Sequence, residues 1–126
     1  MKWIITLHPV SISKSSGIRR VPFSPNKILQ WSTKYKWKSA WHDQIGWACK
    51  EARVPKMEKA HVLVKLYSVK QMDRDNAYAS CKPIFDGVVK AGILKDDKAE
   101  FCVMEVEQIK VNRYNDEKVG LEIESL

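Results

Sequence analysis

A run of β-branched and aliphatic residues at positions 60–70, AHVLVKLYSVK, limits the possible folds of this chain more than any other segment. Its nearly continuous apolar character is typical of a strand in the middle of a sheet, so we expect a central strand here. The chain then passes directly into Asp73. Apolar residues next recur every three or four positions, which predicts a helix over residues 76–91 that Pro83 kinks and Gly92 ends.

The remaining segments complete an α+β pattern. Residues 2–7 predict a short first strand, and residues 34–53 predict a helix whose apolar stripe, including Trp37 and Trp41, faces the core. Residues 101–112 and 118–124 alternate apolar with polar side chains, which indicates an antiparallel hairpin with one wet face. We therefore expect one α+β domain over residues 1–126, with a mixed or antiparallel sheet and two helices packed on it.

Basic residues gather in the first half of the chain. Residues 1–72 contain fourteen Lys or Arg against three Asp or Glu, while residues 73–126 contain eight against twelve, within a net charge of +7. This asymmetry suggests that the first half holds a polyanion and the second half a metal ion. The alternative is an ordinary basic protein with an uneven surface charge, and composition favours neither interpretation.

Residues 8–27 contain three prolines, five serines and one glycine, which predicts a long mobile loop with a short strand near 18–21. Its basic residues are expected to close on phosphate, although a merely solvated loop explains them nearly as well. On the helix that follows, two lysines one turn apart lie among aromatic residues, a pattern that suits nucleic-acid binding. The basic residues concerned are Lys14, Arg19, Arg20 and Lys27 in the loop and Lys34 and Lys38 on the helix.

The number of cysteines and the hydropathy of the chain indicate in which cellular compartment the protein is expected. The three cysteines are an odd number at wide spacings, so the sequence indicates neither a disulfide framework nor a zinc site, and we expect reduced thiols in the core. No apolar run has the length of a membrane helix, and the first residues do not form a signal peptide. We therefore expect a cytoplasmic protein that does not associate with membranes.

Five of the fifteen acidic residues lie within residues 72–98. Asp73 and Asp75 follow the predicted central strand, and in extended chain such alternate residues face the same side. One of Asp96 and Asp97 is expected to join them at a sheet edge, because carboxylates packed so closely repel one another unless a cation gathers them. Three carboxylates without histidine or cysteine suit Mg²⁺ or Mn²⁺ rather than zinc. Alternatively, Asp75 merely caps the helix.

Lys82 lies seven residues after Asp75, which is nearly two helical turns, so the two side chains are expected on one helical face. A lysine beside a metal-bound phosphate stabilises the charge of the transition state or protonates a leaving oxygen. The alternative is a salt bridge between Lys82 and Asp86 at i,i+4 spacing. Spacing alone does not choose between the two.

Together these residues form the pattern DRDN at 73–76, KPIFDG at 82–87, AG at 91–92 and DD at 96–97. The pattern resembles the RusA family of Holliday junction resolvases, which are common in phages and prophages. Ser24, Pro25, Asn26 and Trp31 resemble the N-terminal proline, asparagine and tryptophan motif of that family, and the rest of the chain is only loosely similar. The lysine of the best-known member lies closer to the second aspartate, whereas the longer spacing of Lys82 is similar to that of other phage-associated members.

The resemblance implies a small homodimeric endonuclease that uses Mg²⁺, with Mn²⁺ as a substitute, to nick four-way DNA junctions symmetrically during recombination and repair. It implies that Asp73, Asp75 and Asp97 bind the metal and that Lys82 is the catalytic lysine. It adds Asn26 to the DNA-binding residues, and it places the protein in the cytoplasm of a bacterium or a phage-infected host cell. Three alternatives stay open: a nuclease for flaps or branched DNA in general, a non-catalytic phage DNA-binding protein, and a basic protein-interaction module.

Overall fold

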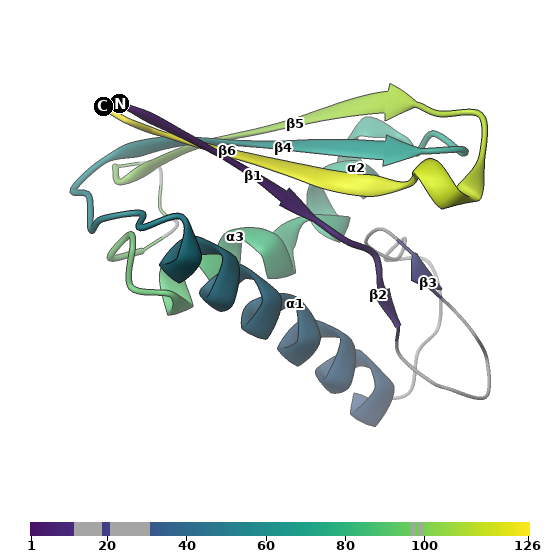
Figure 1. The fold of residues 1–126 in the computed structure, drawn as a ribbon, viewed down its shortest axis with the longest axis horizontal. Helices are drawn as coiled ribbons and strands as arrows, with labels where there is room; N and C mark the ends of the chain where they lie inside the picture. The colour runs from purple at the N-terminus through teal and green to yellow at the C-terminus, as the bar shows by residue number, and fades with distance from the viewer. Residues whose placement is uncertain (12–18, 21–30, 97, 99) are drawn as a thin grey trace.

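A computed structural model describes residues 1–11, 19–20, 31–96, 98 and 100–126, without the side chains of residues 10, 11, 19, 20 and 31–34. A four-stranded mixed sheet carries helices on one of its faces, as Figure 1 shows, and this confirms the expected α+β class. Across the described residues, no helix combines the length and the apolar character that a membrane span requires.

The sheet is built around β4 (Ala60–Ser68), the strand expected to be central. Its neighbours are β6 (Lys118–Ser125) on one side and β5 (Cys102–Lys110) on the other, and β1 (Lys2–Leu7) pairs with the far edge of β6. Alternate residues of β4 are buried against the helices, while those between them are half-buried on the other face. The strand therefore has a neighbour on both edges and one fully covered face.

The predicted hairpin of β5 and β6 is wrong, because β4 lies between these two strands. β5 runs parallel to β4, and β6 runs antiparallel to it. After β5 the chain crosses the end of β4, where the Val111 N–H donates to the Ser68 carbonyl at 3.0 Å, and it forms the short helix η1 (Tyr114–Asp116) before entering β6. The alternation of apolar and polar residues determines which face a strand buries, but it does not determine which strand lies beside it.

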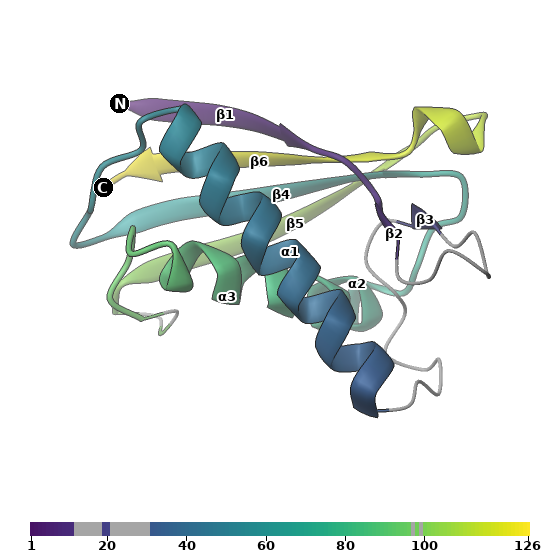
Figure 2. The same cartoon turned by 60° about the horizontal axis from the view of Figure 1, so that its bottom comes forward.

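The helices α1 (Trp31–Glu51) and α3 (Lys82–Lys90) pack against each other on the covered face, and Figure 2 shows α1 lying across that face. Trp37 and Trp41 are buried, as predicted. Gly87 allows the close approach of the two helices, because a Cβ atom at this position would lie 2.8 Å from Cδ1 of the buried Ile45. The apolar stripe of α1 and the absence of a side chain at Gly87 thus allow the two helices to pack closely against each other.

The second predicted helix is divided in two. α2 (Arg74–Ser80) ends at Cys81, and α3 begins at the next residue with Pro83 in its first turn. A proline is tolerated there because the first N–H groups of a helix have no partner within it. The prediction of one helix over 76–91 that is kinked at Pro83 is therefore wrong, because two helices meet at Cys81. The predicted end at Gly92 is confirmed, and its φ of 82° is a left-handed conformation that glycine adopts without strain.

Cys49, Cys81 and Cys102 are buried and form no disulfide, which confirms the expectation of core thiols. Burial raises the pKa of Cys49 to about 11 and also raises the pKa of Cys81. Both thiols are therefore neutral at physiological pH and are poor metal ligands.

Two short strands, β2 (Val10–Ser11) and β3 (Arg19–Arg20), pair antiparallel beyond the end of β1. They confirm the short strand predicted near residues 18–21. The predicted mobility of the loop at 8–27 concerns residues that lie mostly outside the described part of the chain.

A charged network lies on the uncovered sheet face. Glu122 is only 7% exposed, and its two carboxylate oxygens each lie 2.7 Å from an ammonium group, that of Lys2 and that of Lys65. The hydrogen bond from Lys2, followed by the one from Lys65, holds the pKa of Glu122 below its ordinary value of 4.5. This stabilisation is complete above pH 4.5 and is lost as the pH falls through the lower pKa of the folded state.

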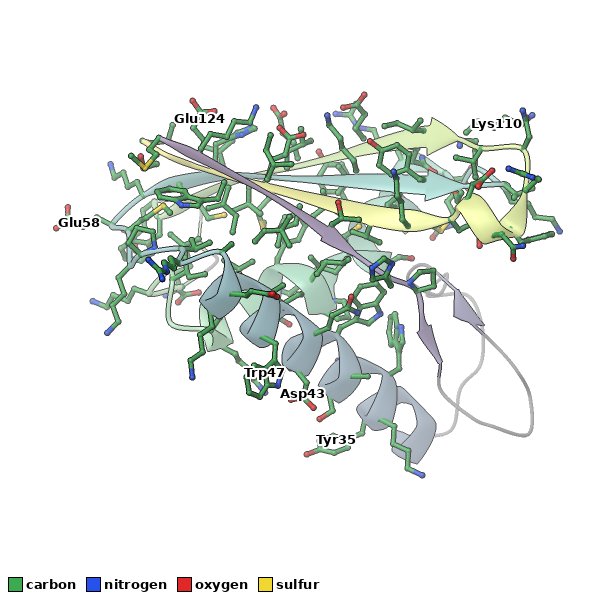
Figure 3. The ribbon with its side chains drawn as sticks, viewed as in Figure 1. Tyr35, Asp43, Trp47, Glu58, Lys110 and Glu124 are labelled. Carbon is green, nitrogen blue, oxygen red and sulfur yellow. The ribbon has the colours of Figure 1, made fainter. Side chains whose placement is uncertain are left out.

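We expect Glu122→Gln to lower the free energy of unfolding at pH 7 by about 1 kcal/mol, because two charge-assisted hydrogen bonds are lost at a site whose lysines remain partly in water. The difference from wild type should shrink as the pH falls from 4.5 through the lowered pKa at which the wild-type carboxylate takes up its proton. Urea denaturation at several pH values measures both effects. Glu124→Gln is the matched control, since Glu124 is exposed on the same strand and face (Figure 3); an equal loss in that variant would contradict the prediction.

Candidate metal and nucleic-acid site

Asp73 and Asp75 lie where the chain leaves β4 and enters α2. Asp73 occupies the N-cap position with a φ of −56° and a ψ of 150°, and Asp75 lies in the first turn. The alternative in which Asp75 caps the helix is therefore wrong, and Asp73 itself makes no side-chain capping hydrogen bond. Both residues are exposed, and within the described part of the chain neither carboxylate has a hydrogen-bond or ion-pair partner. Local structure leaves both carboxylates available to a ligand.

The donor chemistry at this point fits a hard cation. Carboxylate oxygens are the protein ligands that Mg²⁺ and Mn²⁺ prefer, and Mg²⁺ commonly binds through one or two carboxylates while phosphate and water complete its coordination. Asp73 and Asp75 meet that requirement. Among residues 1–11, 19–20, 31–96, 98 and 100–126, no group of three or more His, Cys, Asp or Glu gathers in a way that holds a metal ion.

Among the described residues, Asp96 does not join this site within one chain. Asp97 lies outside them, but its neighbours Asp96 and Lys98 are placed at the start of β5, where the Lys98 carbonyl accepts a hydrogen bond from the Cys102 N–H at 3.0 Å. The segment before Asp73 instead contacts Gln108. The part of β5 from Cys102 to Gln108 is about 20 Å long at about 3.3 Å per residue.

Asp96 therefore does not meet Asp73 at one sheet edge, and the predicted ligand Asp97 lies outside the described residues. The physical reason is the parallel pairing of β4 with β5. A connection between parallel strands has to carry the chain back to the end where the first strand began. Asp73 follows the C-terminal end of β4, whereas Asp96 precedes the first residue of β5, at the opposite end of the sheet.

Lys82 is exposed at the start of α3, and its Nζ lies 3.2 Å from Oδ1 of Asp86. The predicted i,i+4 salt bridge is therefore present. A shared helical face of Lys82 and Asp75 requires one continuous helix, whereas the chain forms two helices that meet at Cys81. The lysine is thus held within α3, by an exposed pair of the kind that contributes little to stability.

The basic candidates are described only in part. Lys38 is exposed on α1, Lys34 lies in the same helix, and Arg19 and Arg20 form β3. For the last three residues only the backbone is described. The predicted DNA-binding residues Lys14, Asn26 and Lys27 lie outside the described residues.

The β2–β3 hairpin and the start of α2, which carries the two aspartates, lie at the same end of the sheet (Figures 1 and 2). Strand register explains why, because one row across the sheet contains Leu7, Val119, Leu66 and Gln108. The chain leaves Leu7 toward β2, and Gln108 contacts the residue before Asp73. These two edges are three strand spacings apart, about 14 Å.

Two residues near the aspartates escaped the sequence analysis. Glu117 is buried and accepts a hydrogen bond from the Val69 N–H at 3.0 Å, and Gln108 contacts Met72. A signal for Gln108 exists in the sequence. It follows Cys102, Met104 and Val106 at the inward positions of an alternating strand, where a polar side chain requires a partner.

The sequence matches no protein-family model and no curated protein.

Proposed function

We propose that this chain is a Mg²⁺-dependent endonuclease that nicks branched DNA and prefers four-way junctions. One observation carries the proposal: Asp73 and Asp75 are exposed and have no partner among the described residues, and the start of α2, where they lie, is at the same end of the sheet as the basic β2–β3 hairpin. A site for a hard cation beside cationic elements suits the phosphodiester of a polyanion. The motif resemblance to the RusA family supports the same activity, which belongs in the cytoplasm of a bacterium or a phage-infected cell.

Each proposed residue has a distinct role. Asp73 and Asp75 hold the metal, Mg²⁺ or its substitute Mn²⁺, which when bound activates water and stabilises the charge that develops on the phosphate. Lys82 exchanges its exposed salt bridge with Asp86 for a phosphate oxygen of the substrate. The basic residues of the hairpin and α1 hold backbone phosphates, so the protein reads the shape of branched DNA more than its sequence.

We place the third carboxylate of the proposed site, Asp97, on a second chain. Its described neighbours lie at the end of the sheet opposite to Asp73, which supports a site whose carboxylates come from two chains. In the proposed two-fold dimer, Asp97 of each chain lies beside Asp73 and Asp75 of the other chain, so the dimer contains two complete sites. It also provides the two sites that paired nicks in a symmetric junction require.

The test is nicking of a four-way junction by the wild-type protein and by Asp75→Asn, each with Mg²⁺ and with EDTA. We expect the wild type to nick the junction only with Mg²⁺, and we expect Asp75→Asn to be at least ~100-fold slower, because removing a metal ligand weakens both metal binding and charge stabilisation. Linear duplex is the substrate control. Equal activity of the two proteins contradicts the proposal.

The substrate preference is tested in the same experiment. Cleavage of flaps at the same rate as junctions would replace the junction preference with a general branched-DNA activity. Tight junction binding without cleavage would make the protein a DNA-binding protein, and weak junction binding even at low salt would favour a protein-interaction module.

A further inference from the structure

Gln108 is a polar residue on the covered side of β5, and its whole amide group is engaged by one residue. The Met72 N–H donates to Oε1 of Gln108 at 2.7 Å, and Nε2 of Gln108 donates to the Met72 carbonyl at 2.8 Å. A glutamine that pairs with both polar groups of one backbone residue acts in place of a neighbouring strand. It fixes the position and the orientation of that residue together.

This contact lies directly before Asp73, one of the two candidate metal ligands. The Met72 carbonyl belongs to the peptide bond that enters Asp73, so the amide of Gln108 sets the plane from which the Asp73 side chain departs. The other end of the same segment is also held, because Glu117 accepts from the Val69 N–H and the Ser68 hydroxyl donates to the Lys70 carbonyl at 2.9 Å. The connection between β4 and α2 is thus fixed at both ends.

We propose that Gln108 is a positioning residue for the metal-binding aspartates. It acts through the Met72 backbone, holding Asp73, and through it Asp75, in the arrangement that binds the cation. This inference rests on the proposed function, since it assumes that these carboxylates bind a metal. It adds that metal binding depends on Gln108, a residue of another strand that is distant in sequence and does not itself bind the metal.

The chain contains a matched control for this role. Gln44 of α1 makes the same two hydrogen bonds to another backbone residue: the His8 N–H donates to its Oε1 at 2.7 Å, and its Nε2 donates to the His8 carbonyl at 3.0 Å. The contact lies beside β1, at the sheet edge opposite to β5. Removing it tests what the loss of such a pair does to the protein in general.

The test is a calorimetric titration of the full chain with Mn²⁺ alone, for wild type, Gln108→Met, Gln44→Met and Asp73→Asn. Methionine keeps the length of glutamine and removes both hydrogen bonds. We expect Gln108→Met to bind Mn²⁺ at least about tenfold more weakly than wild type, the usual result of losing a group that orients a metal ligand. We expect Gln44→Met to bind Mn²⁺ as wild type does, and amide exchange at Met72 to be faster only in Gln108→Met.

The outcomes separate the two proposals. If Asp73→Asn weakens Mn²⁺ binding and Gln108→Met does not, the positioning role of Gln108 is overturned and the metal site stands. If wild type binds no Mn²⁺, or Asp73→Asn binds it as wild type does, the proposed function fails and the inference falls with it. Should Gln108→Met not fold, Gln108→Leu decides, because it also removes both hydrogen bonds and adds no charge near the cation; wild-type affinity in that variant overturns the role.

Discussion

Equal amounts of the Asp75→Asn and Asp97→Asn proteins, each inactive alone, are expected to regain about a quarter of the wild-type nicking rate when mixed. The expectation follows from a site shared between two chains. Random exchange makes about half of the dimers mixed, and in each mixed dimer one of the two sites receives both substitutions while the other receives neither. A site contained in one chain has no such intact combination.

The measurement is junction nicking after the two proteins have been incubated together long enough to exchange subunits, which mass spectrometry of a tagged chain verifies. A mixture of Asp73→Asn with Asp75→Asn is the control, because both residues lie on the same segment and every site of a mixed dimer then carries one lesion. Recovery in that control, or no recovery in the test mixture after verified exchange, contradicts the shared site. Full activity of Asp97→Asn alone would remove Asp97 from the metal site.

Trp41→Ala is expected to lower the free energy of unfolding by about 3–5 kcal/mol, the range for truncation of a buried aromatic side chain. The Trp41 side chain is fully buried between α1 and the sheet, so its removal loses apolar contact and leaves a cavity that the helix backbone cannot fill. Among the described residues its indole N–H has no hydrogen-bond partner, so no hydrogen bond is lost with it. For a small domain this change removes a large share of the total stability.

Urea denaturation at pH 7 measures this loss through the midpoint of the transition. Trp47→Ala is the matched control, since Trp47 lies on the same helix but is 72% exposed and points away from the sheet (Figure 3). Its truncation should change the stability by no more than about 0.5 kcal/mol. Similar losses in the two variants would contradict the placement of Trp41 in the core.

Local sequence patterns predicted the secondary structure well. The strand at residues 2–7, the central strand after residue 60 and the buried stripe of the first helix agree with the structure, because each depends on the periodicity of nearby side chains. The end at Gly92 agrees because it follows from the backbone chemistry of a single residue, whereas the predicted kink at Pro83 is instead a division into two helices at Cys81.

For the candidate site, the sequence singled out the residue types but did not establish which of them meet. Asp73 and Asp75 were predicted to follow the central strand with their carboxylates on one side, and the structure places both residues at the start of α2. Gln108 was missed, although it occupies an inward position of β5, because its partner is the backbone of a residue 36 positions earlier in the chain.

What the sequence by itself determined about this protein is therefore its elements, its buried faces and the presence of an acidic pair beside a basic half. Only the tertiary structure decided that β4 separates β5 from β6 and that Asp96 lies far from Asp73. The physical reason is that side-chain alternation is satisfied by any neighbouring strand with an apolar face, whereas pairing depends on the packing of the whole sheet. The parallel register of β4 and β5 then places the two acidic segments at opposite ends.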